Sequence, residues 1–322
     1  MGRLIAGRWH TEEEIPRSAD GRFVRSRTRF HARVSAEPGA LHPVAAGRYH
    51  LFLSWACPWA HRVHIGLELL GLGPAISTCF ANAHMGEQGW RFGPGLAEVP
   101  DEVVGIDRLW ELYLRADPRV DGRATVPVLW DRERGTIVNN ESREILRMLS
   151  TELAPLHREG APQLCPPELR ERIDEVIDAI YEPINNGVYR SGFANTQEAY
   201  EEAVGELFAA LDHWEAVLAE QRWLCGDRLT EADICLFTTL VRFDSVYVYH
   251  FKCNLRRLVD YPNLWGFTRD VYQRPGVAGT VHLDHVKRHY YGSHPSVNPR
   301  GIVPVGPRLD LESPHGRERL GG

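Results

Sequence analysis

The sequence predicts an α/β domain followed by an all-helical domain, and three observations support this. A strand, a tight turn and a helix follow one another over residues 48–72. Strand and helix patterns continue to residue 150. Beyond residue 167, apolar residues recur at a spacing of about 3.6 without any strand pattern. The predicted ranges are an irregular arm (1–47), the α/β domain (48–150), a proline-containing linker (151–167), the helical domain (168–294) and an irregular tail (295–322).

Composition limits the function classes. The chain has 322 residues, 43% of them hydrophobic, which is enough for two cores of ordinary size. The net charge of −6 without a long basic run argues against nucleic acid as a partner. The six cysteines show no paired spacing, and we find no signal peptide or apolar run of membrane-spanning length. We therefore expect a reduced, soluble, cytoplasmic protein with no membrane partner.

Residues 48–72 place a cysteine at the start of a helix. Apolar and other residues alternate over residues 49–54, as in a largely buried strand. Pro58 suits the first helical position, and Gly71 suits the helix end. Cys57 then faces the unpaired N–H groups and the positive end of the helix dipole, which favour the nucleophilic thiolate. His61 and Arg62 add positive potential nearby.

The oxidised form of this cysteine follows from its neighbours. The position three residues after Cys57 is Ala60, so no local Cys-x-x-Cys disulfide can close. We expect a mixed disulfide with a small thiol instead. The alternative is a buried structural cysteine before a helix.

The remaining elements of the first domain predict its topology. Their order is strand, helix, strand, long insert, strand, strand, helix, which is the thioredoxin-like arrangement. After the first helix we expect a strand at 75–80, an insert at 81–122 with helical spacing at 109–114, a hairpin of 123–130 and 135–138, and a helix at 141–149.

Two features of this domain suggest a binding site. Pro127 lies inside a strand-like run and predicts a cis peptide bond that leaves the backbone of Val126 able to pair with an extended peptide. The helix opening near Glu141 and Ser142 offers N–H groups to a carboxylate, and Glu141 can meet an ammonium group. With Cys57 facing a sulfur, these features match the shape of glutathione. The alternatives are an edge-strand proline and an ordinary helix start.

The second domain contains several predicted helices. Thr230 and Asp233 form a capping box before an apolar run. The helical ranges are 171–181, 197–221, 231–249 and 263–273.

Four histidines near the end of this domain raise the question of a metal. His285 and His289 have i, i+4 spacing, with His282 and His294 nearby. No third ligand is obvious, so we expect no metal and favour a hydrogen-bonding cluster that supports Tyr290.

Strings over residues 48–294 resemble the cytosolic glutathione transferases, and more specifically the glutathionyl-hydroquinone reductases, or Xi class. They are Arg48-Tyr-His-Leu, Cys57-Pro-Trp-Ala-His-Arg62, Thr125-Val-Pro-Val-Leu-Trp130, Ile137-Val-Asn-Asn-Glu-Ser142, Asn185-Asn-Gly-Val-Tyr189, Val241-Arg-Phe-Asp244, His250-Phe-Lys-Cys-Asn-Leu-Arg256 and Lys287-Arg-His-Tyr-Tyr-Gly-Ser-His294.

The resemblance implies a thiol-dependent reduction with glutathione as co-substrate. Glutathione would bind at Val126, Glu141 and Ser142, and Cys57 would attack the sulfur of a glutathionyl-hydroquinone. Tyr189 and Tyr290 would supply the acid for the departing ring.

The resemblance also implies supporting residues and a homodimer. Trp90 would pack on glutathione, Arg123 would pair with a glutathione carboxylate, and Tyr291 is the next candidate after Tyr290. From the residues alone, Tyr189 would be a turn residue and Tyr290 a core residue. Two other functions remain open: an omega-like transferase that reduces small mixed disulfides or dehydroascorbate, and a non-catalytic interaction module.

Overall fold

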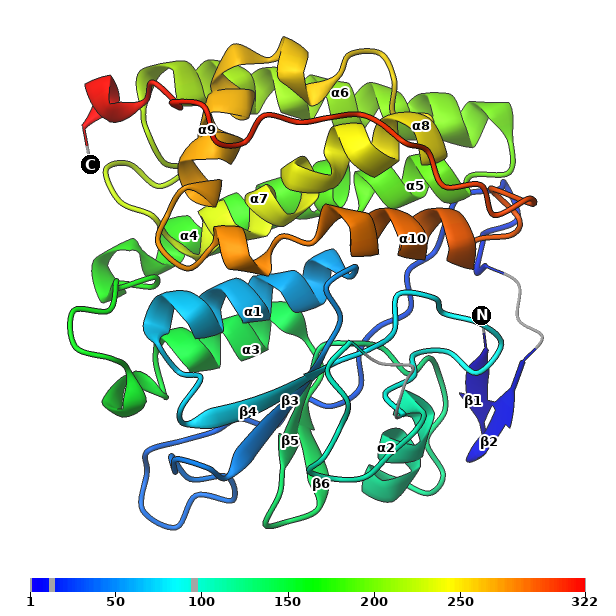
Figure 1. Cartoon of the computed structure of the whole chain (residues 1–322), viewed down its shortest axis with the longest axis vertical. Helices are drawn as coiled ribbons and strands as arrows, with labels where there is room; N and C mark the ends of the chain where they lie inside the picture. Colours follow the sequence, from blue (N-terminus) through cyan, green and yellow to red (C-terminus); the bar gives the residue numbers. More distant parts are fainter. Residues whose placement is uncertain (1, 12–14, 94–97, 322) are drawn as a thin grey trace. The chain divides into compact units, whose positions relative to one another are not determined.

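The computed structural model describes residues 2–11, 15–93 and 98–321, and the chain divides into two compact units (Figure 1). Unit 1 consists of Met1–Ile15, Ser26–Pro162 and Asp284–Ser293, and unit 2 of Pro16–Arg25, Gln163–Leu283 and His294–Gly322. These ranges cross the predicted domain boundaries. Residues 16–25 of the arm join the helical unit, and residues 284–293 of the helical range join the α/β unit.

The sheet of unit 1 has the predicted thioredoxin-like order. Its strands are β3 (Tyr49–Leu53), β4 (Ile76–Phe80), β5 (Val128–Asp131) and β6 (Thr136–Asn139), arranged β4-β3-β5-β6. β3 pairs parallel with β4 and antiparallel with β5, and β5 pairs antiparallel with β6. All five residues of β3 are buried, as expected for the central position.

The helices of unit 1 begin and end where local signals place them. α1 (Pro58–Leu70) has Pro58 at its first position and ends at Gly71, whose φ of 68° is left-handed. α1 lies beside α3 (Ser142–Ser150) along the sheet (Figure 1). α2 (Leu109–Ala116) confirms the helix expected inside the insert. A 3-10 turn spans Ala154–Leu156, and α10 (Leu283–Ser293) carries the histidine-rich segment.

The N-terminal arm is not irregular throughout. β1 (Arg3–Ile5) and β2 (Arg8–His10) form an antiparallel hairpin. Its two turn residues, Ala6 and Gly7, have φ angles of 48° and 74°, as a type I′ turn requires. Sequence inspection missed this turn because alanine rarely adopts positive φ. Leu4 and Val34 are fully buried, so the arm contributes to the core of unit 1.

Unit 2 is built from helices and turns. Its α-helices are α4 (Arg170–Ile180), α5 (Gly187–Phe193), α6 (Gln197–Glu220), α7 (Glu231–Arg242), α8 (Val248–His250) and α9 (Pro262–Tyr272). π-helical turns span Tyr181–Asn185 and Phe243–Tyr247, and 3-10 turns span Pro167–Leu169, Leu258–Asp260, Ala278–Thr280 and Glu318–Leu320. The predicted helices of this unit are confirmed, whereas α5 was not predicted because it is short and follows a proline-containing turn.

The predicted capping box at the start of α7 is present. The Asp233 carboxylate accepts hydrogen bonds from the backbone N–H of Thr230 (2.7 Å) and of Leu224 (2.8 Å). Burial raises the pKa of Asp233 to about 6, although these hydrogen bonds oppose the shift. No helix in the described ranges is both long and apolar enough to cross a membrane.

Candidate active site

Cys57 occupies the junction between β3 and α1. It is the N-cap residue of α1, with φ −74° and ψ 119°, and its carbonyl accepts a hydrogen bond from His61 N–H at 3.0 Å. Its side chain is 9% exposed. The Sγ atom lies 3.6 Å from the carbonyl oxygen of Val126, to which the thiol donates. The structure therefore brings together the predicted nucleophile and the predicted peptide-binding backbone.

The predicted cis peptide bond is confirmed between Val126 and Pro127. β5 begins at the next residue, Val128, so Val126 lies just before the sheet ladder of β5. Its carbonyl points toward the Cys57 thiol, as the 3.6 Å contact requires.

Glu141 and Ser142 lie at the start of α3. Glu141 is the N-cap residue, and its Oε1 accepts from the Arg143 N–H at 3.3 Å. Its Oε2 accepts from the Thr28 hydroxyl at 3.2 Å, so the N-terminal arm helps to hold this carboxylate. Ser142 Oγ lies 3.5 Å from Nη1 of Arg62, a residue of α1. The helix that carries Cys57 is thus tied to the helix start predicted to bind the ligand.

Tyr113 connects the two predicted glutathione-binding segments, and sequence inspection missed it. Its hydroxyl donates to the Thr125 carbonyl at 2.8 Å and accepts from the Thr125 N–H at 3.1 Å. It also accepts from Asn140 Nδ2 at 2.9 Å. Thr125 precedes Val126 and Asn140 precedes Glu141, so one buried hydroxyl fixes both segments. Burial raises the pKa of Tyr113, which keeps the phenol neutral at pH 7.

Trp90 and Tyr290 both adjoin His289 of α10. Trp90 stacks on the His289 ring, with centroids 4.7 Å apart and an interplanar angle of 12°. His289 Nδ1 lies 2.8 Å from the Ala83 carbonyl, which anchors α10 within unit 1. Tyr290 and Tyr291 are both buried. The predicted acid Tyr290 therefore belongs to the same compact unit as Cys57 and Val126.

Two predicted residues have other surroundings. Arg123 is half-buried in the segment that leads to β5. Tyr189 lies on α5 of unit 2, not in a turn, and its side chain is mostly buried. The Arg25 guanidinium lies over the Tyr189 ring, with Cζ 4.7 Å from the centroid, and Arg25 Nε donates to Asn186 Oδ1 at 2.7 Å.

Three of the four histidines contact different neighbours. His285 Nδ1 lies 3.3 Å from Glu98, and His289 bonds a backbone carbonyl. His294 belongs to unit 2, where its Nδ1 lies 3.0 Å from His250 Nε2. His285 and His289 lie one helical turn apart on α10 and contact different segments, whereas His294 follows the end of this helix.

A different group in unit 1 combines metal-ligand residue types. Within the described ranges, the one group of three or more such side chains is His50, Cys79 and Asp101. His50 Nε2 is 3.2 Å from Cys79 Sγ, and its Nδ1 is 2.7 Å from the Ser77 hydroxyl. Burial lowers the pKa of His50 to about 4, so the imidazole is neutral at pH 7.

The third member of this group, Asp101, stabilises the loop that follows it. Asp101 accepts from the N–H groups of Val103 and Val104 at 2.9 Å and from that of Ile106 at 3.0 Å. Hydrogen bonding within the fold therefore accounts for all three residues. No sequence motif signals this group.

Comparisons with known proteins show the family of the chain. The family model "Glutathione S-transferase, N-terminal domain" matches residues 56–152, and the model for the C-terminal domain matches residues 197–270. The chain is 48% identical to "Glutathionyl-hydroquinone reductase YqjG" of Escherichia coli, covering 99% of both chains. It is 51% identical to "Glutathionyl-hydroquinone reductase PcpF" of Sphingobium chlorophenolicum, covering 97% of this chain and 98% of that one.

Solved structures give the same result. A "Xi Class GST from Natrialba magadii" superposes with a TM-score of 0.94 at 51% identity, covering 100% of this chain and 98% of that one. The glutathione-bound structure of YqjG from Escherichia coli gives a TM-score of 0.88 at 46% identity, covering 98% and 99%.

The thioredoxin-like unit, the helical unit and the cysteine beside a cis-proline turn thus define a class, and the chain belongs to the glutathione transferase family. Within this family it is similar over its whole length to the Xi class, whose curated relatives are named glutathionyl-hydroquinone reductases.

Proposed function

We propose that this protein reduces glutathionyl-hydroquinones to hydroquinones and releases glutathione disulfide. The observation that carries the proposal is the Cys57 thiol at the N-terminus of α1, 3.6 Å from the Val126 carbonyl. The whole-length similarity to two glutathionyl-hydroquinone reductases supports it. The helix N-terminus favours the thiolate, which is the form that attacks sulfur.

The proposed reaction has two steps, a displacement at a thioether sulfur followed by a thiol–disulfide exchange. The Cys57 thiolate attacks the glutathione sulfur, a disulfide forms, and the sulfur–carbon bond to the ring breaks. The electron pair of that bond goes to the ring carbon, which takes a proton and becomes the hydroquinone C–H. A second glutathione thiolate then attacks the mixed disulfide, so that glutathione disulfide leaves and Cys57 returns as a thiolate.

The proposed binding residues follow the tripeptide. The backbone of Val126 pairs with its middle, whereas Glu141 and Ser142 hold the amino-acid end. Trp90 packs on it, and Arg123 pairs with a carboxylate. The geometry around Glu141 supports this arrangement, because Thr28 and the α3 backbone already hold its carboxylate in place.

The proposed proton donors are Tyr189 and Tyr290. An acid is needed because a ring carbanion is a poor leaving group. The Arg25 guanidinium lies over the Tyr189 ring, 4.7 Å from its centroid, which supports a fixed orientation of the proposed donor.

The first experiment is mass spectrometry after incubation with a glutathionyl-hydroquinone and no free glutathione. We expect one glutathione added at Cys57. The Cys57→Ser protein should carry no adduct and should lose reductase activity, whereas Cys165→Ser serves as a control for a cysteine outside the site. Full activity in Cys57→Ser would overturn the mechanism.

A second candidate is an omega-like activity, meaning reduction of small mixed disulfides or dehydroascorbate. A specific observation favours it: the chain is 43% identical to "Glutathione S-transferase omega-like 2" of Schizosaccharomyces pombe, covering 92% of this chain and 96% of that one. Both activities need Cys57, but only thioether reduction needs the ring acid. Tyr189→Phe and Tyr290→Phe should therefore impair quinone thioether reduction and spare disulfide exchange. Equal retention of both activities would refute the tyrosine assignment.

We also propose that the protein is a cytoplasmic homodimer, as the family resemblance implies. Light scattering during size-exclusion chromatography measures the mass directly. A mass of one chain across micromolar concentrations would contradict the dimer.

A further inference from the structure

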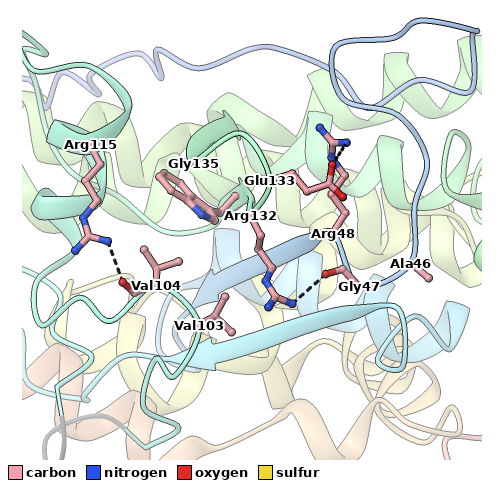
Figure 2. A pocket seen from close by; sticks show the side chains of 10 residues that line it. Ala46, Gly47, Arg48, Val103, Val104, Arg115, Arg132, Glu133 and Gly135 are labelled. Atoms are coloured by element: carbon pink, nitrogen blue, oxygen red, sulfur yellow. Dashed lines mark hydrogen bonds and ion pairs between the residues drawn. The ribbon is translucent and has the colours of Figure 1, made fainter.

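A hollow of about 680 Å³ opens in unit 1 around the start of β3 (Figure 2). Residues from the segment before β3, the loop after Asp101, the end of α2 and the β5–β6 hairpin line it. A hollow of this volume accommodates a small organic molecule. Its lining includes Arg48, Val103, Val104, Arg115, Arg132 and Glu133.

The hollow and Cys57 lie toward opposite ends of β3. Arg48 precedes β3, whereas Cys57 follows its end at Leu53. A five-residue strand extends about 16 Å, so the two sites lie toward opposite ends of the same strand. A ligand in the hollow would not occupy the proposed glutathione site.

One of the three lining arginines is neutralised within the fold. Arg48 Nη2 lies 2.7 Å from the fully buried carboxylate of Asp131, and its Nη1 lies 2.6 Å from Glu133. Burial opposes ionisation of Asp131, but the hydrogen bonds from Arg48 and His42 outweigh it and lower the pKa of Asp131. Arg48 and its two carboxylate partners together carry a charge of −1, so this group adds no positive charge to the hollow.

The other two arginines keep their charge. Arg115 Nη1 donates to the Val104 carbonyl at 2.9 Å, and Arg132 Nη1 donates to the Gly47 carbonyl at 3.0 Å. No carboxylate in the described part of the chain forms an ion pair with either side chain. These single bonds orient each guanidinium and leave most of its five N–H donors for another acceptor. In Figure 2 the two guanidiniums lie on either side of Val103 and Val104.

We propose that this hollow binds a small organic dianion whose two carboxylate or phosphate groups flank a short apolar middle. Arg115 and Arg132 each take one anionic group, because guanidinium matches both oxyanions in a two-pronged geometry. Val103 and Val104 contact the middle. Together with the −1 of the Arg48–Asp131–Glu133 group, Arg115 and Arg132 give the surroundings of the hollow a net charge of +1. This charge favours anions locally, although the protein carries −6 overall.

The test is calorimetric titration of the full chain at fixed ionic strength. The probes are benzene-1,4-dicarboxylate, butane-1,4-diyl bis(methyl phosphate), whose two phosphodiesters carry one charge each, and the monoanion benzoate. We expect one dianion to bind with 1:1 stoichiometry at least tenfold more tightly than benzoate. Whichever dianion binds identifies the oxyanion as carboxylate or phosphate.

Variants decide whether the hollow is the site. Arg115→Gln and Arg132→Gln should each weaken dianion binding at least tenfold, while Arg134→Gln should bind like the unaltered protein. Arg134 is an exposed arginine of the same hairpin turn outside the hollow, which makes it a matched control. Unchanged binding in the first two variants, equal weakening in all three, or no binding of either dianion would each overturn the proposal. Unfolding curves of every variant separate lost binding from lost folding.

Discussion

Replacing Tyr113 with phenylalanine should both destabilise the protein and impair its use of glutathionylated substrates. The change removes one oxygen and leaves the ring in place. That oxygen makes hydrogen bonds of 2.8 and 3.1 Å to the two backbone groups of Thr125 and one of 2.9 Å to Asn140. Each buried hydrogen bond contributes about 1 kcal/mol, so the free energy of unfolding should fall by about 3 kcal/mol.

The same hydroxyl fixes the position of the proposed substrate-binding groups. Without it, the segments carrying Val126 and Glu141 lose a shared side-chain anchor, although the pairing of β5 with β6 still joins them. A shift of a fraction of an ångström in such groups should lower kcat/KM roughly tenfold, mainly through a higher KM. Reactivity of the Cys57 thiol toward a small alkylating agent should change little, because the Tyr113 hydroxyl bonds to Thr125 and Asn140.

The assays are urea unfolding and steady-state kinetics with a glutathionyl-hydroquinone. Tyr272→Phe is the matched control, since among the residues that the structure describes its hydroxyl bonds only to the exposed Glu312, at 3.0 Å. That variant should lose less than about 0.5 kcal/mol and keep its KM. If Tyr113→Phe matched Tyr272→Phe in both measurements, Tyr113 would not be the connecting residue that its hydrogen bonds indicate.

Three further predictions follow from burial and packing. Because the folded pKa of His50 is about 4 against an ordinary 6.5, the unfolded chain binds more protons between these values. Protonation of His50 in the unfolded chain should thus lower the free energy of unfolding by about 3 kcal/mol as pH falls from 6.5 to 4. Urea unfolding of His50→Gln should show a shallower dependence of this free energy on pH. An identical slope in the variant would contradict the prediction. A Cβ at Gly192 would lie 2.1 Å from the Phe251 ring, so Gly192→Ala should lower the free energy of unfolding by about 2 kcal/mol. Gly205→Ala is the control, because the space around Gly205 is open, and it should not lose stability in thermal unfolding. Thr230→Ala should lower the denaturation midpoint through about 1 kcal/mol of lost capping, and an unchanged midpoint would refute that role.

The sequence patterns predicted those parts of the fold that local signals determine. Pro58 and Gly71 delimit α1, and the apolar pattern of residues 49–53 identifies β3. Pro127 predicted the cis bond beside the site. In each case one residue or a short pattern restricts the backbone by itself.

The parts that sequence missed depend on partners far along the chain. Nothing near Tyr113 indicates that its hydroxyl meets residues 125 and 140. Likewise, Asp101 joins His50 and Cys79 only because the sheet and the following loop bring them together. The histidines of α10 were assigned one shared role, whereas their partners lie on separate segments. Such contacts are properties of tertiary structure, and no residue spacing encodes them.

The division of the chain has a consequence for its biosynthesis. Unit 1 needs Asp284–Ser293, which leave the ribosome only after most of the helical unit has been made. Unit 1 therefore cannot complete its fold until residues 284–293 have been translated, although its sheet is synthesised early. Each unit consists of three separate segments, so cutting the chain once cannot release either unit intact. A truncated or fused gene that is meant to encode one unit would have to include all three of its segments.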